Sequence, residues 1–359
     1  MNRRSCLLLL AAAMAAPAAA QETFQATNIA NPLHPLQHAW QEWKGMCLMS
    51  DGRVVDSFQD GASHSEGQGY GLVLAAMFAD HASCRAIITW TEQHLAVRDD
   101  ALLAWRWRPQ ATPQVEDLNN ASDGDIFYAW GLLLAGDLLG NADWRIRATE
   151  IARDLDRLCL IDHPDGSGDV LLLPAAQGFV RDDGVLINPS YYMPLAMFHL
   201  AEATGTPRLA DSARNGITLI DTLGTAGPVP DWILLFGSQI LPAPEGFSTL
   251  AGYEAVRVPL FALWSGNAVS PAVLSYVRVT LEGGLGSTPT RIDSATGEVL
   301  ERSSHSGYAA VTRLGACASA GEVGSLMPRF DSDQPYYPAT LHLMSLLVQI
   351  TTYPRCVPL

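Results

Sequence analysis

Lysine is almost absent from this 359-residue sequence: Lys44 is the only one, and charged residues of all kinds make up 16% of the chain. With 37 acidic against 22 basic residues, the formal charge is −15. Nucleic acids and anionic lipids bind basic surfaces, so this balance argues against either as the main partner. The 48% of hydrophobic residues and the nine tryptophans exclude intrinsic disorder and can form a sizeable core.

The motifs of several common enzyme classes are also missing. No G-x-x-x-x-G-K-[ST] occurs, so a phosphate-binding loop of that type cannot be placed. Neither G-x-S-x-G nor H-E-x-x-H is present, which removes the usual signals of serine hydrolases and zinc peptidases. Residues 67–71 (GQGYG) have the wrong spacing for a dinucleotide-binding loop, and no predicted strand precedes them.

No metal site is predicted, and no cofactor is required. Asp162, Asp165 and Asp169 could ligate calcium, but the spacing of an EF-hand is absent. A polar turn is the favoured interpretation of this segment.

The one long apolar run lies at the N-terminus. Two arginines at positions 3 and 4 precede an apolar stretch from Cys6 to Ala16, and small residues follow before Gln21. This order is typical of a cleaved secretory signal, so residues 1–20 are predicted to be a signal peptide and 21–359 one exported domain, periplasmic or secreted. An uncleaved anchor is the less favoured alternative, because the run is short. No later run approaches the roughly 20 residues of a membrane helix.

Five cysteines follow the predicted signal, and none of them forms a C-x-x-C pair that would suggest a zinc ribbon or a redox motif. An odd number allows at most two internal bridges and leaves a free thiol. Spacing does not determine the pairing, and buried thiols with one bridge at most are expected. The five are Cys47, Cys84, Cys159, Cys317 and Cys356.

Helical periodicity is abundant, whereas strand-like alternation is scarce and short, as in residues 170–173. The breaks at 227–230 and 241–244 are interpreted as loops within one domain. Eleven or twelve helices recurring about every 25–30 residues suit paired helices that close into an all-α barrel, with loops at one end free to form a groove. The predicted helices are 40–47, 66–80, 84–95, 125–139, 144–160, 192–203, 207–223, 255–264, 271–281, 307–318 and 338–352.

Carboxylates near aromatic residues are the remaining candidates for chemistry. Glu66 and Asp123 lie at the starts of two predicted helices, where an acid also serves as an ordinary complement to the helix dipole. Aromatic rings near helix ends can stack on sugar rings, although most are expected in the core. These rings are Trp105, Trp107, Tyr128, Trp130, Tyr191, Tyr192, Trp232, Tyr336 and Tyr337.

Five short motifs in one order resemble glycoside hydrolase family 8. They are S-E-G-Q-G-Y-G (65–71), A-S-D-G-D (121–125), N-P-S-Y (188–191), P-D-W (230–232) and Y-E-A-V-R (253–257). Segments 293–297 and 336–337 fit as well, so the similarity spans nearly all of the mature chain. It is greatest to family members associated with bacterial cellulose synthase, which implies a link to that complex.

The resemblance implies an (α/α)6 barrel of about twelve helices that hydrolyses a β-1,4-glucan chain with inversion. It implies that Glu66 is the proton donor, and that Asp123 grips and distorts the sugar ring, since an inverting enzyme forms no covalent sugar. The base is usually the aspartate of Y-D-A-x-R, which is Glu254 here. The substrate-binding residues are expected to be Tyr70, Trp105, Trp107, Ser122, Tyr191, Trp232 and Arg257.

The glutamate at position 254 departs from the family pattern. One extra methylene moves the carboxylate by roughly 1 Å, and such a shift can cost about 10²-fold in rate. Three interpretations remain: Glu254 is the base with an adjusted backbone, which we favour, or Asp123 or another acid replaces it, or the enzyme is weak.

Proton donation near neutral pH requires a raised pKa for Glu66, whereas a helix N-terminus lowers it. An ionised carboxylate nearby, such as Asp123, has the right sign to raise it. Other activities of the family stay open: xylanase, mixed-linkage glucanase, or chitosanase, which the acidic charge favours slightly. A glucan-binding protein that assists the synthase, with residual catalysis, is the alternative of a different class.

Overall fold

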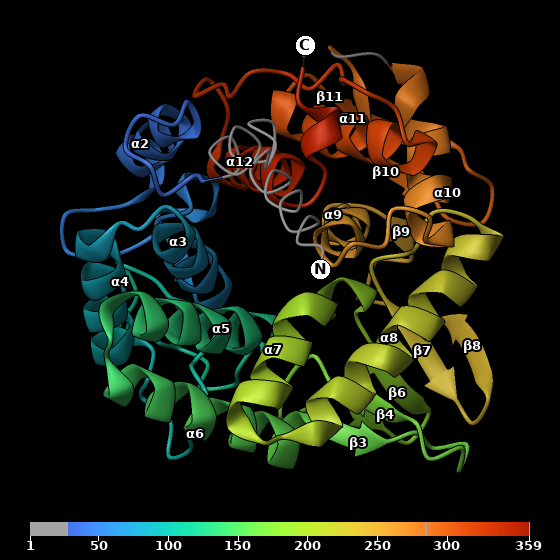
Figure 1. The fold of residues 1–359 in the computed structure, drawn as a ribbon. Coiled ribbons are helices and arrows are strands. Elements are labelled where there is room, and N and C mark those ends of the chain that lie inside the picture. Colours follow the sequence, from blue (N-terminus) through green and yellow to red (C-terminus); the bar gives the residue numbers. More distant parts are fainter. Residues whose placement is uncertain (1–27, 284–285, 359) are drawn as a thin grey trace, which may run out of the picture.

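The computed structural model describes residues 28–283 and 286–358, and the eleven α-helices of this part follow one another around a ring (Figure 1). The predicted signal peptide and Cys6 lie outside the described residues. The helices are α2 (Leu36–Cys47), α3 (Ser65–Met77), α4 (His81–His94), α5 (Ser122–Leu139), α6 (Ala142–Cys159), α7 (Pro194–Thr204), α8 (Pro207–Ala226), α9 (Arg257–Trp264), α10 (Pro271–Thr280), α11 (Ser306–Ala320) and α12 (Tyr336–Thr351).

The helices form two layers because their sequences differ in how much surface they can bury. Helices α3, α5, α9 and α12 are buried on nearly all sides, so they lie toward the inside of the ring. Outer helices such as α6 bury one stripe at helical spacing and expose the rest, as an amphipathic helix does. Helix α12 packs against α2, so the last helix lies beside the first described one.

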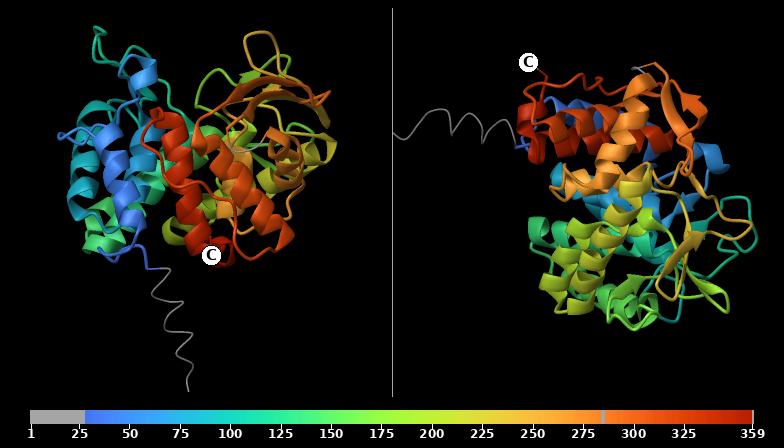
Figure 2. Two further views of the ribbon diagram at one scale, coloured as in Figure 1. Left: turned by 90° about the horizontal axis from the view of Figure 1, so that it is seen from above. Right: turned by 90° about the vertical axis from the view of Figure 1, so that its right-hand side faces the viewer.

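The strands are short and gather with the long loops at one end of the ring (Figure 2). They form four small antiparallel sheets, with orders β1-β2, β3-β4, β5-β6-β7-β8 and β11-β10-β9. The strands are β1 (Ser63–His64), β2 (Arg106–Trp107), β3 (Leu160–Asp162), β4 (Val170–Leu172), β5 (Val180–Arg181), β6 (Gly184–Ile187), β7 (Ile233–Phe236), β8 (Gln239–Pro242), β9 (Leu250–Ala251), β10 (Thr288–Asp293) and β11 (Val299–Ser303).

All eleven predicted helices are present, with ends displaced by a few residues. The strand content is higher than predicted: β4 coincides with the alternation at 170–173, but the four-stranded sheet was not foreseen. Segment 241–244, predicted as loop, supplies the end of β8 (Gln239–Pro242). Strands of two to six residues are too short for a period-two pattern to stand out.

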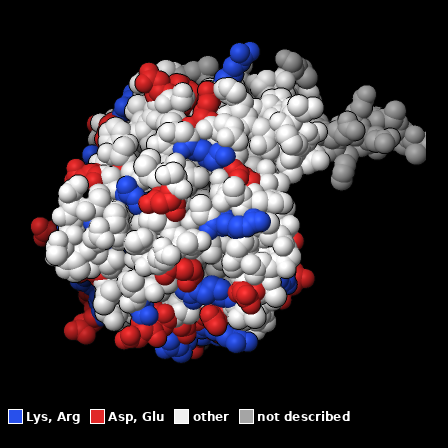
Figure 3. Space-filling model, turned by 90° about the vertical axis from the view of Figure 1, so that its left-hand side faces the viewer, with Lys and Arg blue, Asp and Glu red and all other residues white. Residues whose placement is uncertain are grey.

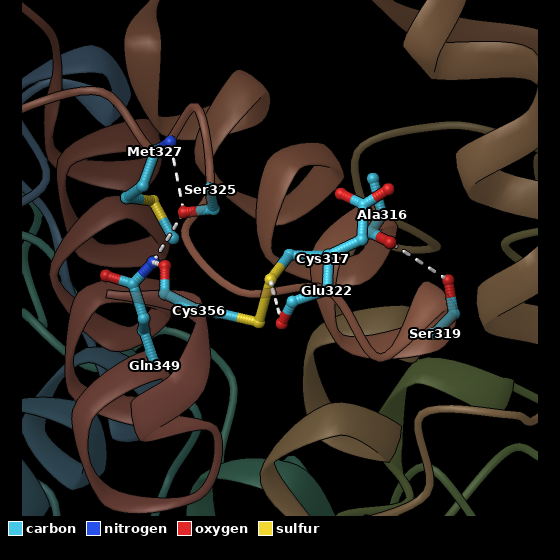
Figure 4. Close-up of a disulfide and its surroundings, with 8 residues drawn as sticks. All are labelled: Ala316, Cys317, Ser319, Glu322, Ser325, Met327, Gln349 and Cys356. Atoms are coloured by element: carbon cyan, nitrogen blue, oxygen red, sulfur yellow. Dashed lines mark hydrogen bonds between the residues drawn. A yellow bond between two sulfur atoms is a disulfide. The ribbon is translucent and has the colours of Figure 1, made fainter. Parts of the chain in front are cut away.

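One disulfide, Cys317–Cys356, joins the end of α11 to the short 3-10 turn after α12, with the Cα atoms 5.9 Å apart (Figure 4). Gln349 supports the same corner: its Nε2 donates to the carbonyl of Cys356 at 2.7 Å. The other three cysteines of the described chain, Cys47, Cys84 and Cys159, are buried free thiols. The expectation of one bridge at most is therefore confirmed.

The polar turn predicted for residues 162–169 is present, and charges of both signs are mixed on one face of the molecule. Acidic and arginine side chains are interspersed on the face that Figure 3 shows, rather than separated into patches of one sign. Asp165 accepts from the backbone N–H of Ser167 at 2.8 Å, and the N–H of His163 donates to the carbonyl of Asp169, so segment 162–169 is a turn. Within the described ranges there is no cluster of three potential metal ligands, and no helix has the length and apolarity to cross a bilayer.

Candidate active site

Arg257, the first residue of α9, is the centre of a cluster of carboxylates, and its side chain is only 3% exposed. Its Nη1 donates to Glu66 and, at 3.1 Å, to Oδ2 of Asp123. Its Nη2 donates to Glu254 and, at 2.6 Å, to Oγ of Ser190. Three acids from distant parts of the sequence therefore surround one guanidinium, and the motifs 65–71, 121–125 and 253–257 meet in space.

Two glycines allow the close approach of α3 and α5 that brings Glu66 beside Asp123. A Cβ atom on Gly124 would lie 2.6 Å from the backbone nitrogen of Glu66, and one on Gly69 would lie 2.8 Å from Cβ of Phe127. Neither distance is tolerable for a real side chain. The glycines of S-E-G-Q-G and S-D-G-D are therefore needed for helix packing, which in turn sets the distance between the two acids.

Burial raises the pKa of Glu66 to about 8, and the negative charges of Asp123 and Glu254 add to this effect while Arg257 opposes it. The expected contribution of Asp123 has the right sign, but burial is the larger cause. The pKa of Asp123 is also raised, again mainly by burial. Glu66 is thus protonated at neutral pH, in the state that an acid catalyst needs.

Glu254 has a different setting, because its side chain is 37% exposed. Nδ2 of Asn188 donates to its Oε2 at 3.1 Å. Asn188 caps the 3-10 turn Pro189–Tyr191 and accepts from Oγ of Ser190 at 2.7 Å. The N-P-S-Y motif therefore forms a short turn whose Asn188 and Ser190 side chains orient Glu254 and Arg257 through hydrogen bonds. Asn188 and Ser190 were not predicted as site residues, although the motif that contains them was recognised.

Asp231 of the P-D-W motif fixes the backbone that carries Glu254. Its Oδ1 accepts from the N–H of Gly252 at 3.0 Å and from that of Ala255 at 2.8 Å, and its Oδ2 accepts from Ser248 at 2.8 Å. With these bonds on both sides of it, Glu254 is held in a defined loop. Asp231 was not predicted as a site residue, although it stands in the P-D-W motif.

A cleft of about 520 Å³ opens beside Glu66 and Glu254, and residues of β1 and β11 form part of its lining. Acidic and aromatic side chains line this cleft. Tyr336 and Tyr337 were among the aromatic residues singled out in the sequence, whereas the exposed Phe58 was not. The lining residues are Asp56, Phe58, Gln59, His64, Glu66, Tyr253, Glu254, Arg257, Glu301, Arg302, Ser303, His305, Tyr308, Pro335, Tyr336, Tyr337 and Pro338.

Of the seven predicted substrate-binding residues, Arg257 lines the cleft. Tyr191 and Trp105 each contact a cleft residue, and Trp232 contacts Tyr191. The guanidinium of Arg257 lies over the ring of Tyr191, 5.5 Å from its centroid. Trp232 stacks on Phe179 with centroids 5.9 Å apart, and Phe247 leans against it at 5.0 Å. Trp105 stacks on the cleft residue His64 at 6.1 Å. Phe179 and Phe247 were not predicted, because loop aromatics without a motif give no signal.

The other three predicted substrate-binding residues are engaged within the protein. Tyr70 is buried, and its hydroxyl accepts from Nη1 of Arg257 at 3.4 Å. Trp107 is buried edge-on against Trp90, with centroids 5.5 Å apart. Oγ of Ser122 donates to the carbonyl of Leu173 at 2.7 Å. None of these three residues lines the cleft.

Comparison with known proteins gives a consistent result. The model of the family described as glycosyl hydrolases family 8 matches residues 5–351. A probable endoglucanase of Novacetimonas hansenii is 32% identical over 336 residues, covering 92% of this chain and 96% of that protein. An endoglucanase of Cellulomonas uda is 31% identical over 233 residues, covering 64% and 63%.

Solved structures agree with the arrangement of helices. The endo-β-1,4-glucanase CMCax from Acetobacter xylinum superposes with a TM-score of 0.77 at 30% identity, covering 90% of this chain and 98% of that one. These similarities confirm the fold class predicted from the sequence, the all-α (α/α)6 barrel.

Proposed function

This chain belongs to glycoside hydrolase family 8, and we propose that it is an endo-1,4-β-glucanase that cleaves β-1,4-glucan with inversion of the anomeric configuration. The observation that carries the proposal is the pair of acids on separate nitrogens of Arg257: a protonated Glu66, whose side chain is 21% exposed, and Glu254, whose side chain is 37% exposed. Inverting enzymes hold their acid and base roughly 6.5–9.5 Å apart, so that a water molecule fits between base and sugar. A guanidinium between the two acids keeps them from touching.

In this mechanism the proton on Glu66 passes to the glycosidic oxygen, and the leaving chain departs as an alcohol. Glu254 takes a proton from the water that attacks the anomeric carbon from the opposite face. Asn188 and Arg257 hold one oxygen of Glu254, which leaves its Oε1 to face the water. Asp123, paired with Arg257 deep in the cluster, grips the sugar ring between the two acids.

An open cleft with aromatic rings in and around it supports internal cleavage of a long chain. An exposed ring such as Phe58, which lines the cleft, can stack on a glucose unit. The relatives named endoglucanase, from Novacetimonas hansenii and Cellulomonas uda, support cellulose and soluble derivatives such as carboxymethylcellulose as substrates.

Chitosan is the second candidate, because four acidic residues line the cleft: Asp56, Glu66, Glu254 and Glu301. A cationic polymer would be attracted to that lining. Release of reducing sugar from carboxymethylcellulose, xylan, lichenan and chitosan in parallel decides between the activities. Binding of glucan without release of sugar would instead support a synthase-assisting protein, and fastest release from chitosan would overturn the glucanase assignment.

Export is part of the proposal: residues 1–20 act as a signal peptide, and 21–359 reach the periplasm or the medium as one domain. The Cys317–Cys356 disulfide supports this, because such bonds persist in oxidising compartments. The link to a cellulose synthase complex rests on the sequence resemblance. N-terminal sequencing of the exported protein tests the cleavage site after residue 20.

A further inference from the structure

Tyr336, the first residue of α12, has a hydroxyl group that the mechanism above does not use. The residue lines the cleft and is 4% exposed, yet no described residue makes a hydrogen bond with its hydroxyl. Its neighbours at the site differ: Tyr70 accepts from Arg257, and Tyr337 donates to the carbonyl of Tyr253. A buried, unpaired hydroxyl destabilises a fold, and a phenylalanine would avoid that cost.

The hydroxyl is packed against the backbone next to Glu66. A Cβ atom on Gly67 would lie 2.8 Å from Oη of Tyr336, so only a glycine at this position leaves room for the hydroxyl. Burial and the charges of Glu66 and Asp56 hold the pKa of Tyr336 well above its usual value. The group therefore keeps its proton and can only serve these carboxylates as a donor.

Asp56 already has donors of its own. Its Oδ1 accepts from the N–H of Phe58 at 2.9 Å, and its Oδ2 accepts from Gln59 at 3.1 Å. Glu66 accepts a hydrogen bond from Nη1 of Arg257, and the same nitrogen also donates to Asp123. Once Glu66 has lost its proton, its carboxylate has one protein donor among the described residues, Nη1 of Arg257, whereas Asp56 has two.

We propose that Tyr336 is a positioning residue for Glu66, donating a hydrogen bond to the carboxylate that forms when Glu66 protonates the glycosidic oxygen. The inference rests on the proposed role of Glu66 as the acid. In this step the Glu66 proton moves to the leaving oxygen as the bond to the anomeric carbon breaks, and Tyr336 keeps its own proton throughout. The hydroxyl therefore stabilises the product side of proton transfer rather than supplying the proton.

A pH effect follows from this arrangement. A donor to the ionised form lowers a carboxyl pKa, so its removal raises the pKa of Glu66. Burial raises the pKa of Glu66 to about 8, so the wild-type enzyme is expected to lose activity as the pH rises through that value. Removing the donor moves this alkaline limb upward. The other charged or titratable groups acting on the centre are Arg257, Asp123, Glu254, Tyr70, Tyr191 and Tyr337.

The test compares Tyr336→Phe with Tyr353→Phe. Tyr353 follows the other end of α12, and its hydroxyl is also buried without a partner in the described chain, so the control removes the same atom far from the cleft. On carboxymethylcellulose, Tyr336→Phe is expected to lower kcat about tenfold, change KM less than about twofold, and move the alkaline limb of kcat/KM up by about half a pH unit. Tyr353→Phe is expected to match the wild type.

A Tyr336→Phe enzyme with the wild-type kcat and the wild-type alkaline limb would overturn the inference. A lower melting temperature for Tyr336→Phe would also overturn it, because it would reveal a structural partner for the hydroxyl. Failure of the proposed function looks different: the wild type itself would release no sugar from any glucan. An active wild type with an inactive Glu66→Gln variant keeps that function, whatever Tyr336→Phe does.

Discussion

Two buried aspartates in the first turn of α5 illustrate how the same side chain takes two roles. Asp123 and Asp125 are two residues apart, both are nearly inaccessible, and burial raises the pKa of both, that of Asp125 to about 7. Asp123 faces Arg257 and the other acids. Asp125 accepts from the N–H of Leu103 and from Nδ2 of Asn120, each at 2.8 Å.

Helix geometry explains the difference, since positions two apart on an α-helix point roughly 200° apart. Asp123 therefore faces Arg257, and Asp125 faces the loop residues packed behind the helix. A raised pKa alone does not identify a catalytic acid, because Asp125 has one without contacting the cleft. The hydrogen-bond partners distinguish the two roles. Asp125 accepts from neutral donors and stabilises the fold, whereas Asp123 shares the Arg257 cation with Glu66 and Glu254.

The largest expected effect comes from removing the proton donor on the cleft side of this comparison. Glu66→Gln keeps the shape of the protonated acid but cannot give up a proton. Its kcat on carboxymethylcellulose is expected to fall about 10⁴-fold, at the upper end for a lost general acid. Its melting temperature is expected to stay at or above that of the wild type, because a buried ionisable group is gone. Substantial retained activity would sink the assignment.

Asp123→Asn and Asp125→Asn test the two faces of α5 directly. Asp123→Asn is expected to lower kcat about 10²-fold through loss of positioning, with little change in stability. Asp125→Asn is expected to reduce the free energy of unfolding by about 1–3 kcal/mol, because an amide donor then faces the donor of Asn120. Its activity per folded molecule is expected to be normal. Kinetics and melts for both variants check this, and a reversed pattern would remove the distinction drawn between them.

Glu254→Asp sharpens the account of the base. Shortening the side chain by one methylene withdraws the carboxylate from Asn188 and Arg257 by roughly 1 Å, so kcat is expected to fall about tenfold or more. If the wild type is instead a weakened enzyme, this variant, which restores the usual Y-D-A-x-R motif, would be faster. Steady-state kinetics on carboxymethylcellulose separates the two outcomes.

The smallest effect on turnover is expected far from both aspartates, at the disulfide. The double variant Cys317→Ser/Cys356→Ser removes a disulfide that joins residues 39 apart in the sequence. The chain-entropy model predicts that the free energy of unfolding falls by about 4 kcal/mol. The kcat is expected to remain normal, because the cleft residues His305 and Tyr308 lie at the other end of α11. Denaturant melts and kinetics of the double variant check both halves, and a large loss of kcat would contradict them.

The helices could be predicted because each is long enough for apolar periodicity to show. The acids Glu66, Asp123 and Glu254 were found because they occupy recognisable motifs. That three of these motifs converge on Arg257 was not visible in the sequence, since it depends on how α3, α5 and α9 cross.

Other features had no sequence signal for a physical reason. The strands are short, and pairing of the cysteines depends on distance in space rather than on spacing along the chain. Asp125 and Asp123 carry the same side chain in one motif, so only their partners distinguish them. The unpaired hydroxyl of Tyr336 is likewise a property of its surroundings.

The configuration of the newly formed reducing end tests the central claim most directly. The proposed mechanism assigns the acid role to Glu66 and the base role to Glu254, with attack by water in a single displacement. Proton NMR of the earliest products from a soluble β-1,4-glucan, read before mutarotation, is expected to show the α-anomer. A β-anomer would mean retention through a covalent sugar and would contradict the roles given to these acids.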